Sequence, residues 1–369
     1  MPVFWWYLLK NYLKVSVLSV VSFIAILLVI RLEEIAQFAT IGAKPSYLFL
    51  FTLYQIPYIL PIAIPVSCLI SALILFQRLS HTQELTALRA GGISLRALIA
   101  PILIAGVFLG MGTFYIASEM ATASHLATRR MVYDLTSVNP LILLQSAKIA
   151  RLQSAFVQMD PIRNGESAQD LVIAISNPSG KGLNLCLAKR VELAGELLVA
   201  KQVSLISSSP SDKGCDHLII ENQKWMSSAA PQFASLLRKS GWKIANDHLK
   251  FSLLRARIAD ARSQVNKDLK AVRVLKKCQT EIARRVSMGL SAFTFTLMGI
   301  AFGMEISRQT SKRGIMTVLV LSALTLIAFC VGKELDHLVM ISSLLFLLPH
   351  AVIAAASLWT LRRINRGIE

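Results

Sequence analysis

The sequence lacks the short motifs that mark most enzymes. Its 369 residues contain no G-x-x-x-x-G-K-[ST] loop, so the chain cannot cradle the phosphates of ATP by itself. The zinc-protease pattern H-E-x-x-H and the hydrolase pattern G-x-S-x-G are also missing. The 6 histidines are scattered, which favours surface or packing roles over metal binding. We therefore predict a protein that is not an enzyme and has neither a metal site nor a cofactor of its own.

Cysteine is scarce as well, and the 5 residues present include no C-x-x-C pair that would indicate a metal or redox motif. Cys68 and Cys330 fall inside apolar runs, where cysteine behaves as a small hydrophobic residue. Cys186 and Cys215 fall in a polar region where a disulfide is chemically allowed, and the sequence leaves open whether they are bonded.

Long apolar runs are what the sequence has in abundance. Hydrophobic residues make up 54% of the chain and its mean hydropathy is +0.57, which is too high for a soluble protein. A helix needs about 20 apolar residues to cross the roughly 30 Å of hydrocarbon in a bilayer. Six segments meet this requirement, at residues 14–35, 47–76, 97–118, 286–305, 314–332 and 340–361. The polar stretch between the third and fourth predicts one domain inserted between two sets of three helices.

Proline and glycine residues inside these spans bear on helix geometry. Pro57, Pro61 and Pro65 would allow the long second span to tilt or kink. The patterns Gly106-x-x-x-Gly110 and Gly299-x-x-x-Gly303 predict close helix packing, a structural rather than a chemical role.

The short loops predict which side of the membrane each span end faces. Cations are unevenly divided between the two sides. On one side the short segments carry only Arg31, Lys44 and Lys333, and on the other side they carry many more. By the positive-inside rule, both termini face the cytoplasm of a bacterial inner membrane and the large polar domain lies outside. The first span should remain as an anchor, because its apolar stretch is too long for a signal peptide and no small-residue cleavage site follows it. The predicted cytoplasmic side carries most of the loop cations: Lys10, Lys14, Arg78, Arg89, Arg96, Arg308, Lys312, Arg313, Arg362, Arg363 and Arg366.

Basic residues outnumber acidic ones, at 39 against 21, and give a formal net charge of +18. About half of this charge is the cytoplasmic bias of any inner-membrane protein. The remainder, on the exported domain, suits anionic lipid or a phosphorylated substrate. Nucleic acid is not expected as a partner, because that domain lies on the wrong side of the membrane.

The exported domain is predicted to be mostly β structure. Short β-prone runs bounded by turn-forming residues occur at 151–159, 171–176, 183–188, 198–207 and 217–225. Five such runs are typical of a small sandwich or an open barrel-like sheet. From residue 251 to 285, apolar residues recur at helical spacing with Lys and Arg on the other faces. This basic helical arm would either pack on its own domain or lie on the anionic membrane surface.

The most informative segment is a polar island, QELTALRAGGIS, at residues 83–94 between the second and third spans. Its charges would be costly in hydrocarbon, so the segment should emerge at a membrane face. The pattern predicts a short helix over residues 83–89, ended by Gly91 and Gly92, which let the chain turn back into the membrane. Short amphipathic helices in this position are typical of permeases that dock onto a soluble motor.

Together with its surroundings, this segment resembles the LptF/LptG (YjgP/YjgQ) family of lipopolysaccharide-export permeases. The resemblance covers nearly the whole chain, including the WYLLK segment at residues 6–10 and EIARR at residues 281–285, which opens the fourth span. It also rests on the proline-punctuated second span, YQIPYILPIAIPVSCLISALILFQRLS. Two features depart from the family's usual pattern. Ser287 stands near the position where a proline is common after the arginine pair, and the basic arm is longer than usual.

The resemblance implies an α-helical membrane protein with six transmembrane helices, three plus three, and one inserted periplasmic β-jellyroll-like domain. The implied divisions are residues 1–119, 120–283 and 284–369. The implied function is that of a permease half-unit of an ABC-type transporter, which extracts lipopolysaccharide from the inner membrane and passes it to a periplasmic bridge. The implied partners are a paralogous six-span permease, a cytoplasmic ABC ATPase dimer that binds the ATP, a periplasmic jellyroll bridge protein, and lipopolysaccharide that enters between the first and fifth spans of the pair.

The implied site residues fall into two groups. Glu84 would pair with an arginine of the ATPase. Arg31, at the outer end of the first span, would meet a phosphate of lipid A, and the alternative is that it snorkels or pairs with Glu33 or Glu34. The ATPase-coupling candidates are Glu84, Leu85, Leu88, Arg89, Gly91 and Gly92, and the candidate lipid contacts are Arg31, Lys44, Arg284 and Arg285.

Two other functions stay open at this point. One is a mechanotransmitting permease that couples a cytoplasmic ATPase to a periplasmic partner, such as a lipoprotein or a hydrolase, for which four spans would be expected rather than six. The other is a non-transporting membrane scaffold or sensor, which would have no need of a coupling helix.

Overall fold

The computed structural model describes residues 2–40, 45–138, 149–152, 155–163, 167–176, 183–195, 197–208, 217–229, 246–264, 269–304, 312–335 and 337–366. The chain divides into two compact units. The helical unit consists of Met1–Ile30, Tyr54–Leu126 and Ile244–Glu369. The second unit consists of Arg31–Leu53 and Ala127–Lys243 and contains the β-sheet.

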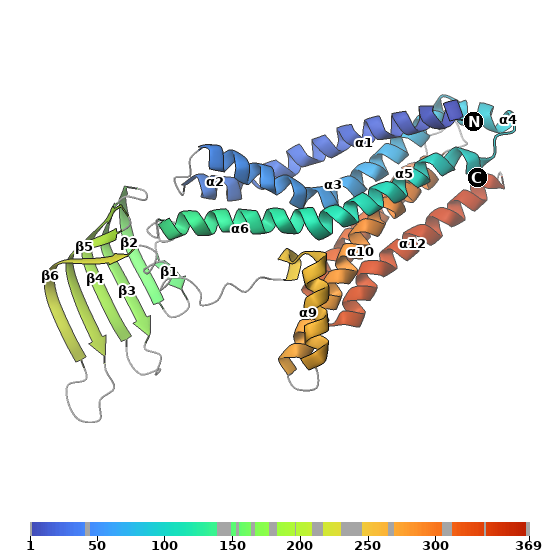
Figure 1. Ribbon diagram of the computed structural model, residues 1–369. Coiled ribbons are helices and arrows are strands. Elements are labelled where there is room, and N and C mark those ends of the chain that lie inside the picture. Colours follow the sequence, from blue (N-terminus) through green and yellow to red (C-terminus); the bar gives the residue numbers. More distant parts are fainter. Residues whose placement is uncertain are drawn as a thin grey trace. The chain divides into compact units, whose positions relative to one another are not determined.

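Long apolar helices dominate the structure (Figure 1). Six helical stretches in the described part of the chain are long and apolar enough to cross a bilayer, three before the sheet and three after it, which confirms the predicted arrangement. The third stretch runs from α5 through a π-helical turn, η1, into α6. The elements are α1 (Pro2–Ile30), α3 (Pro45–His81), α5 (Leu95–Tyr115), η1 (Ile116–Met120), α6 (Ala121–Val138), α10 (Leu269–Gly303), α11 (Lys312–Glu334) and α12 (Val339–Asn365).

The first helix differs from its predicted span of residues 14–35. α1 ends at Ile30, Arg31 interrupts the helix, and a separate short helix, α2 (Leu32–Thr40), follows. The new helix carries Glu33 and Glu34 in its first turn, where carboxylates complement the positive end of the helix dipole. The apolar part of α1 instead extends back toward the N-terminus, beyond the predicted start.

Glycine residues set the distance between neighbouring helices, as their spacing predicts. A Cβ atom added at Gly110 of α5 would lie 2.7 Å from the carbonyl oxygen of Gly289 in α10. One added at Gly299 of α10 would lie 2.6 Å from the carbonyl oxygen of Leu69 in α3. These distances leave no room for a side chain, so the backbones of α3, α5 and α10 touch at these points.

The second unit holds a six-stranded antiparallel sheet in which each strand pairs with the next in chain order (Figure 1). The predicted strand at 151–159 is in fact parts of two strands, which pair antiparallel with Leu152 opposite Ala155. One face of the sheet buries an apolar core: Ala168, Leu171, Ile173, Ala188, Val191, Leu198 and Val203. The strands are β1 (Ile149–Leu152), β2 (Ala155–Arg163), β3 (Ser167–Ser176), β4 (Leu183–Ala194), β5 (Leu197–Ser208) and β6 (His217–Ala229).

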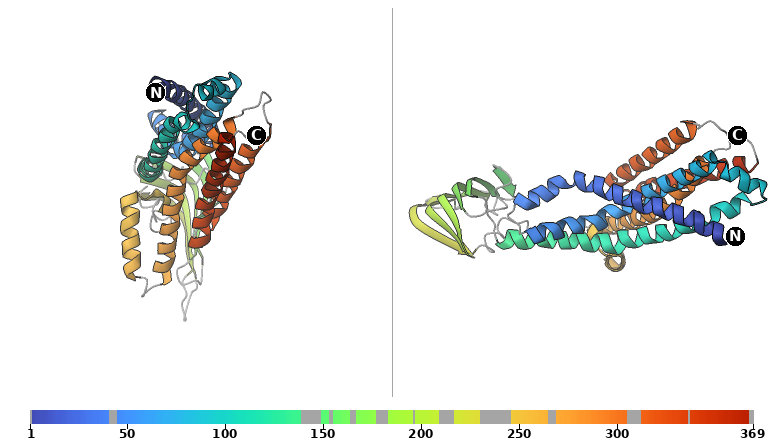
Figure 2. Two further views of the ribbon diagram at one scale, coloured as in Figure 1. Left: turned by 90° about the vertical axis from the view of Figure 1, so that its right-hand side faces the viewer. Right: turned by 90° about the horizontal axis from the view of Figure 1, so that it is seen from above.

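The basic arm forms a helical hairpin and not one continuous helix. After the short turn η2 (Asn246–His248), α9 (Phe251–Gln264) packs beside the first turns of α10 (Figure 2). Leu254 and Ala261 of α9 are buried. The described part of the arm therefore packs within the chain, against α10 of the helical unit.

Candidate functional site

The polar island forms the short helix α4 (Glu84–Ala90), one residue later than predicted. Gln83 precedes it with a φ angle of 59°, a left-handed conformation that redirects the chain after α3. Leu85 is 2% exposed and lies in a buried cluster with Leu8 of α1, Leu95 of α5 and Ile364 of α12. The helix is thus anchored by its own apolar side chain to the ends of several long helices.

The glycine pair ends α4 as predicted, but only one of the two glycines needs to be glycine. Gly92 has a φ angle of +83°, which other residues rarely adopt, whereas Gly91 has an ordinary φ of −73°. The amide of Gly91 donates to the carbonyl of Ala87 at 2.9 Å and closes the helix. Ser94 then caps α5, since its hydroxyl accepts a hydrogen bond from the amide of Ala97 at 3.3 Å. The loop is therefore compact and its geometry is fixed.

The outward face of α4 presents few side chains. Glu84 is half-buried, and one of its carboxylate oxygens accepts a hydrogen bond from the Thr82 hydroxyl at 3.1 Å. Leu88 and Arg89 are also half-buried, and Leu88 packs against the core cluster. Of the predicted coupling residues, Leu85 faces the protein's own interior, so it holds α4 in place and has almost no surface to offer a partner.

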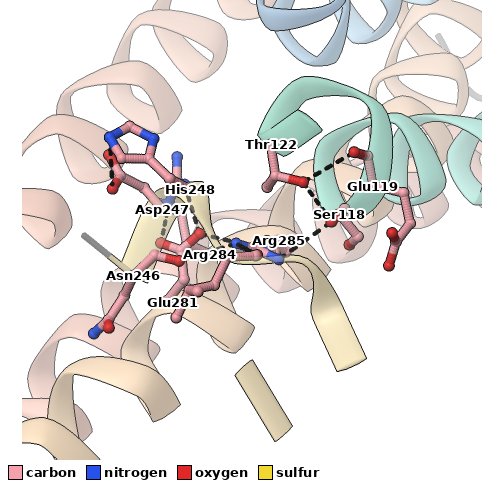
Figure 3. Close-up of polar contacts among 10 residues, drawn as sticks. Ser118, Glu119, Thr122, Asn246, Asp247, His248, Glu281, Arg284 and Arg285 are labelled. Atoms are coloured by element: carbon pink, nitrogen blue, oxygen red, sulfur yellow. Dashed lines mark hydrogen bonds and ion pairs between the residues drawn. The ribbon is translucent and has the colours of Figure 1, made fainter. Parts of the chain in front are cut away.

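The arginine pair of the EIARR segment lies near the middle of α10, in a buried polar cluster (Figure 3). Arg284 binds Glu281 through two parallel hydrogen bonds of 2.7 and 2.8 Å. Arg285 donates to the same carboxylate at 2.8 Å. The side chain of Arg284 is 19% exposed, whereas that of Arg285 is fully buried. One carboxylate therefore serves two guanidinium groups that have different access to solvent.

Arg285 also joins three parts of the helical unit. Its guanidinium donates to the backbone carbonyls of Asn246 at 3.2 Å and Leu249 at 2.8 Å, just before α9. It reaches the carbonyl of Ser118, in the π-helical turn η1, at 3.5 Å. A π-helical turn shifts the backbone hydrogen-bond register, which makes carbonyls available to a side chain. We call Glu281, Arg284, Arg285 and these three carbonyls the arginine cluster.

A cavity of about 430 Å³ lies beside the arginine cluster. Its lining brings together cationic side chains from three helices: Arg257 of α9, Lys277 and Arg284 of α10, and Lys333 of α11. Asp247 and Glu281 supply the carboxylates. The lining therefore has more basic than acidic groups. Lys333 lies in the last turn of α11, just before α12 begins, whereas Ile364 near the end of α12 packs with Leu85 of α4, so the cavity lies toward the end of the helical unit away from α4.

The remaining predicted lipid contacts belong to the segment after α1. Arg31 forms an ion pair with Glu34 of α2, one of the two partners that the sequence allowed. Lys44 and Cys215 lie outside the described residues, and Cys186 carries a free thiol. Sequence reasoning missed Arg257, Lys277 and the carbonyls of the arginine cluster. Only the spacing of Glu281 with Arg284 and Arg285, three and four residues on, signalled a helix-face ion pair.

Comparison with known families shows which family this chain belongs to. A family model described as lipopolysaccharide export system permease LptF/LptG matches residues 6–363. The chain belongs to the LptF/LptG family. A search of curated proteins finds no match.

As an LptF/LptG permease, the protein is a multi-pass membrane component of a lipopolysaccharide export system. It is a transport subunit and not an enzyme, and ATP is bound by a partner ATPase. The family assignment thus selects lipopolysaccharide export over the scaffold and over the other kind of mechanotransmitting permease. It does not by itself assign roles to α4, to the arginine cluster or to the sheet.

Proposed function

We propose that this LptF/LptG permease is one half of its transporter. It pairs with a paralogous six-helix permease, and the two rest on a dimer of the cytoplasmic ABC ATPase. The helix α4 is the docking element, with Glu84 facing a basic residue of the ATPase. The observation that carries the proposal is that Leu85 joins α4 to a single buried core shared with α1, α3, α5, α10 and α12. A displacement of α4 would therefore be passed to five long helices at once.

The proposed orientation places α4 and both termini in the cytoplasm. The start of α1, α4 and the end of α12 lie at the same end of the helical unit (Figure 1). Leu8, Leu85 and Ile364, one from each of these elements, belong to the same core cluster. Short-loop cations gather in the segments at this end, which supports a cytoplasmic assignment by the positive-inside rule. In this orientation the sheet is periplasmic.

The lipid and the second permease are proposed to meet this chain at α1 and α11, the first and fifth spans. Only 6% of the apolar window of α1 and 11% of that of α11 are buried within the chain. The corresponding value is 67% for α3 and for α10. Helices that bury so little against their own chain have large apolar surfaces for lipid tails or for another permease. This exposure supports lateral entry of lipopolysaccharide between the first and fifth spans of the pair.

The cavity beside the arginine cluster is the proposed contact for the phosphates of the entering lipid. Arg284 and Lys333 are its best-placed cations, since Lys333 lies in the last turn of α11, one of the two exposed spans. Arg285 is proposed to position the cluster, because its fully buried guanidinium is used on Glu281 and the backbone. Arg31 and Lys44 remain proposed contacts on the segment after α1. A phosphate would have to displace Glu34 to reach Arg31.

The sheet is proposed to continue into the periplasmic jellyroll bridge. Its two outer strands, β1 and β6, each have one neighbour in the described sheet, so each has an edge to which a further strand can add. The apolar face that buries Leu171, Ile173 and Val203 would then continue as a path for acyl chains. Lipopolysaccharide would leave the membrane along this path.

The docking proposal is tested by Glu84→Ala. Loss of a charge-assisted contact with the ATPase should cost about 1.5–3 kcal/mol of binding free energy. Copurification of the ATPase and lipopolysaccharide-stimulated ATP hydrolysis should both fall. The matched control is Glu334→Ala, which removes an exposed carboxylate from the end of α11, at the far end of the helical unit. The control should behave like wild type. If Glu84→Ala also behaves like wild type, α4 is not the docking element.

A further inference from the structure

Along one line that crosses the strands of the sheet, side chains do not alternate between exposed and buried as expected for β-strands. Three neighbouring strands each expose two consecutive residues, at 169–170 in β3, 189–190 in β4 and 201–202 in β5, and residues 224–225 lie beside them within a longer exposed stretch of β6. In a regular strand, exposed and buried side chains alternate. Two exposed residues in succession therefore mean that the strand rotates at this point. We call these four residue pairs the crease.

The strand register lines the crease up across the sheet. Gln169 lies opposite Arg190, Arg190 opposite Lys201, and Lys201 opposite Trp225. Residues 170, 189, 202 and 224, one from each strand, fall between successive paired positions in these registers and so lie at the same level of the sheet. The crease is thus one continuous line of outward-facing side chains, on the face of the sheet opposite its apolar core.

Backbone strain accompanies the crease. Asp170 has a φ angle of 49° and Gln202 one of 54°, both in the left-handed region that residues with a Cβ atom seldom adopt. Buried Leu171 and Val203 follow them directly and anchor the rotated strands in the core. Strain held in place by a packed core is more common at binding sites than elsewhere.

The chemistry of the crease is cationic and aromatic. Lys189, Arg190, Lys201 and Lys224 line a hollow of about 660 Å³, together with the indole of Trp225, which is 68% exposed. Glu192, just outside the crease, holds Arg190 at 2.9 Å and Lys201 at 2.8 Å. In the described part of the sheet, no ion pair ties up Lys189 or Lys224 in this way.

We infer that the crease binds the anionic saccharide of lipopolysaccharide, with lysine and arginine on its phosphate or carboxylate groups and Trp225 against the face of a sugar ring. The inference rests on the proposal that the lipid travels along this sheet. Acyl chains would then follow the apolar face while the sugars are held on the opposite, cationic face. Each end of an amphipathic substrate would meet a surface of matching chemistry.

A saccharide fits the crease better than a phospholipid headgroup does. Among the described residues, the lining consists of charged and amide side chains together with Val199 and Trp225. Gln169 and Gln202 add amide groups that can both donate to and accept from sugar hydroxyls.

The test measures binding of deacylated lipopolysaccharide, a phosphorylated oligosaccharide without acyl chains, to the full-length protein in detergent micelles. Lys189→Gln combined with Lys224→Gln should weaken binding about tenfold. Trp225→Ala should weaken it about fivefold, and Trp225→Phe should retain most of the affinity. Glu192→Gln should release Arg190 and Lys201 and tighten binding about threefold. The control, Arg129→Gln with Arg130→Gln, removes two exposed cations from α6 in the same unit and should leave affinity unchanged.

Three results would overturn the inference. The first is equal affinity of wild type and the double lysine variant for the oligosaccharide. The second is equal affinity of wild type for the dephosphorylated oligosaccharide. The third is capture of anionic phospholipid vesicles that depends on the crease residues while the oligosaccharide does not bind, which would make the occupant a phospholipid. Lipopolysaccharide-stimulated ATP hydrolysis, measured on the same preparations, reports separately on the transport function. Its persistence alongside any of these results would reject the crease and not the permease.

Discussion

Replacing Arg285 by glutamine should destabilise the helical unit by breaking a buried cluster of polar contacts. The side chain is fully buried and donates to Glu281, Asn246 and Leu249 at 3.2 Å or less. Glutamine cannot span these acceptors, so the buried carboxylate of Glu281 loses one partner, the carbonyl of Leu249 loses the guanidinium, and the carbonyl of Asn246 keeps only the amide of Leu249. Removing one partner from a buried ion pair costs about 3–5 kcal/mol. Arg284 still holds Glu281 in the variant, so we expect a loss of about 3 kcal/mol, near the lower end of that range.

Thermal unfolding in detergent micelles measures the loss, and hydrogen exchange locates it. Exchange should rise at residues 246–249, because these backbone groups are held by the guanidinium. Arg284→Gln is the matched control. It removes a partly exposed guanidinium from the same carboxylate and leaves the contacts of Arg285 intact, so it should cost about 1 kcal/mol. Arg285→Lys keeps the charge but not the branched geometry, and its loss should fall between the two.

The reasoning fails if Arg285→Gln unfolds at the wild-type temperature. It also fails if Arg284→Gln is equally damaging, since burial would then not distinguish the two arginines. Unchanged exchange at residues 246–249 despite a lowered melting temperature would show that the contacts to Asn246 and Leu249 contribute nothing.

Three further predictions concern packing and reactivity. Gly110→Ala should destabilise the protein by about 1–3 kcal/mol, because its Cβ would lie 2.7 Å from the Gly289 carbonyl, whereas Gly112→Ala, two residues along α5 in open space, should be neutral or slightly stabilising in the same melting assay. Leu85→Ala should cost about 2–5 kcal/mol of stability and uncouple ATP hydrolysis from lipopolysaccharide, and normal coupling would contradict the anchoring role of Leu85. Burial raises the pKa of the Cys186 thiol, so in reduced protein it should be alkylated more slowly than a free thiol near pH 8, and alkylation should accelerate as the pH rises further and thiolate forms. Alkylation of Cys186 at the rate of a free thiol would show that the residue is not buried.

The apolar runs predicted the six membrane helices because spanning imposes a minimum length that few other structures need. The end of α1 was placed five residues late, since Arg31 stands inside an otherwise helical pattern and propensity does not mark a break there. The sequence predicts one strand over residues 151–159, because no glycine or proline separates Leu152 from Ala155, whereas these two residues belong to different strands. Local patterns thus located the elements better than they located the breaks between them.

For the functional sites too, the sequence predicted the local element but not the contacts that depend on distant parts of the chain. The composition of residues 83–94 predicted α4 and its glycine stop, because charge between two spans must leave the hydrocarbon. It did not reveal that Leu85 is an anchor, since burial at that position depends on α1, α5 and α12. The arginine cluster depends on backbone carbonyls from residues 118, 246 and 249. Every residue has a carbonyl, so the sequence does not show which ones accept from the arginine. The crease arises from strand register and positive φ angles at Asp170 and Gln202, which are invisible before strands are paired.

The central claim is that lipopolysaccharide reaches the polar cavity at one end of the helical unit while the ATPase acts on α4 at the other. A photo-crosslinking residue in place of Lys333, beside that cavity, tests it in proteoliposomes that contain the assembled transporter. We predict that this position captures lipopolysaccharide and that ATP lowers the capture as lipid moves on. A crosslinker in place of Arg362, near the end of α12 on the α4 side, should capture none. Equal capture at both positions, or capture at Lys333 that is indifferent to ATP, would contradict the account.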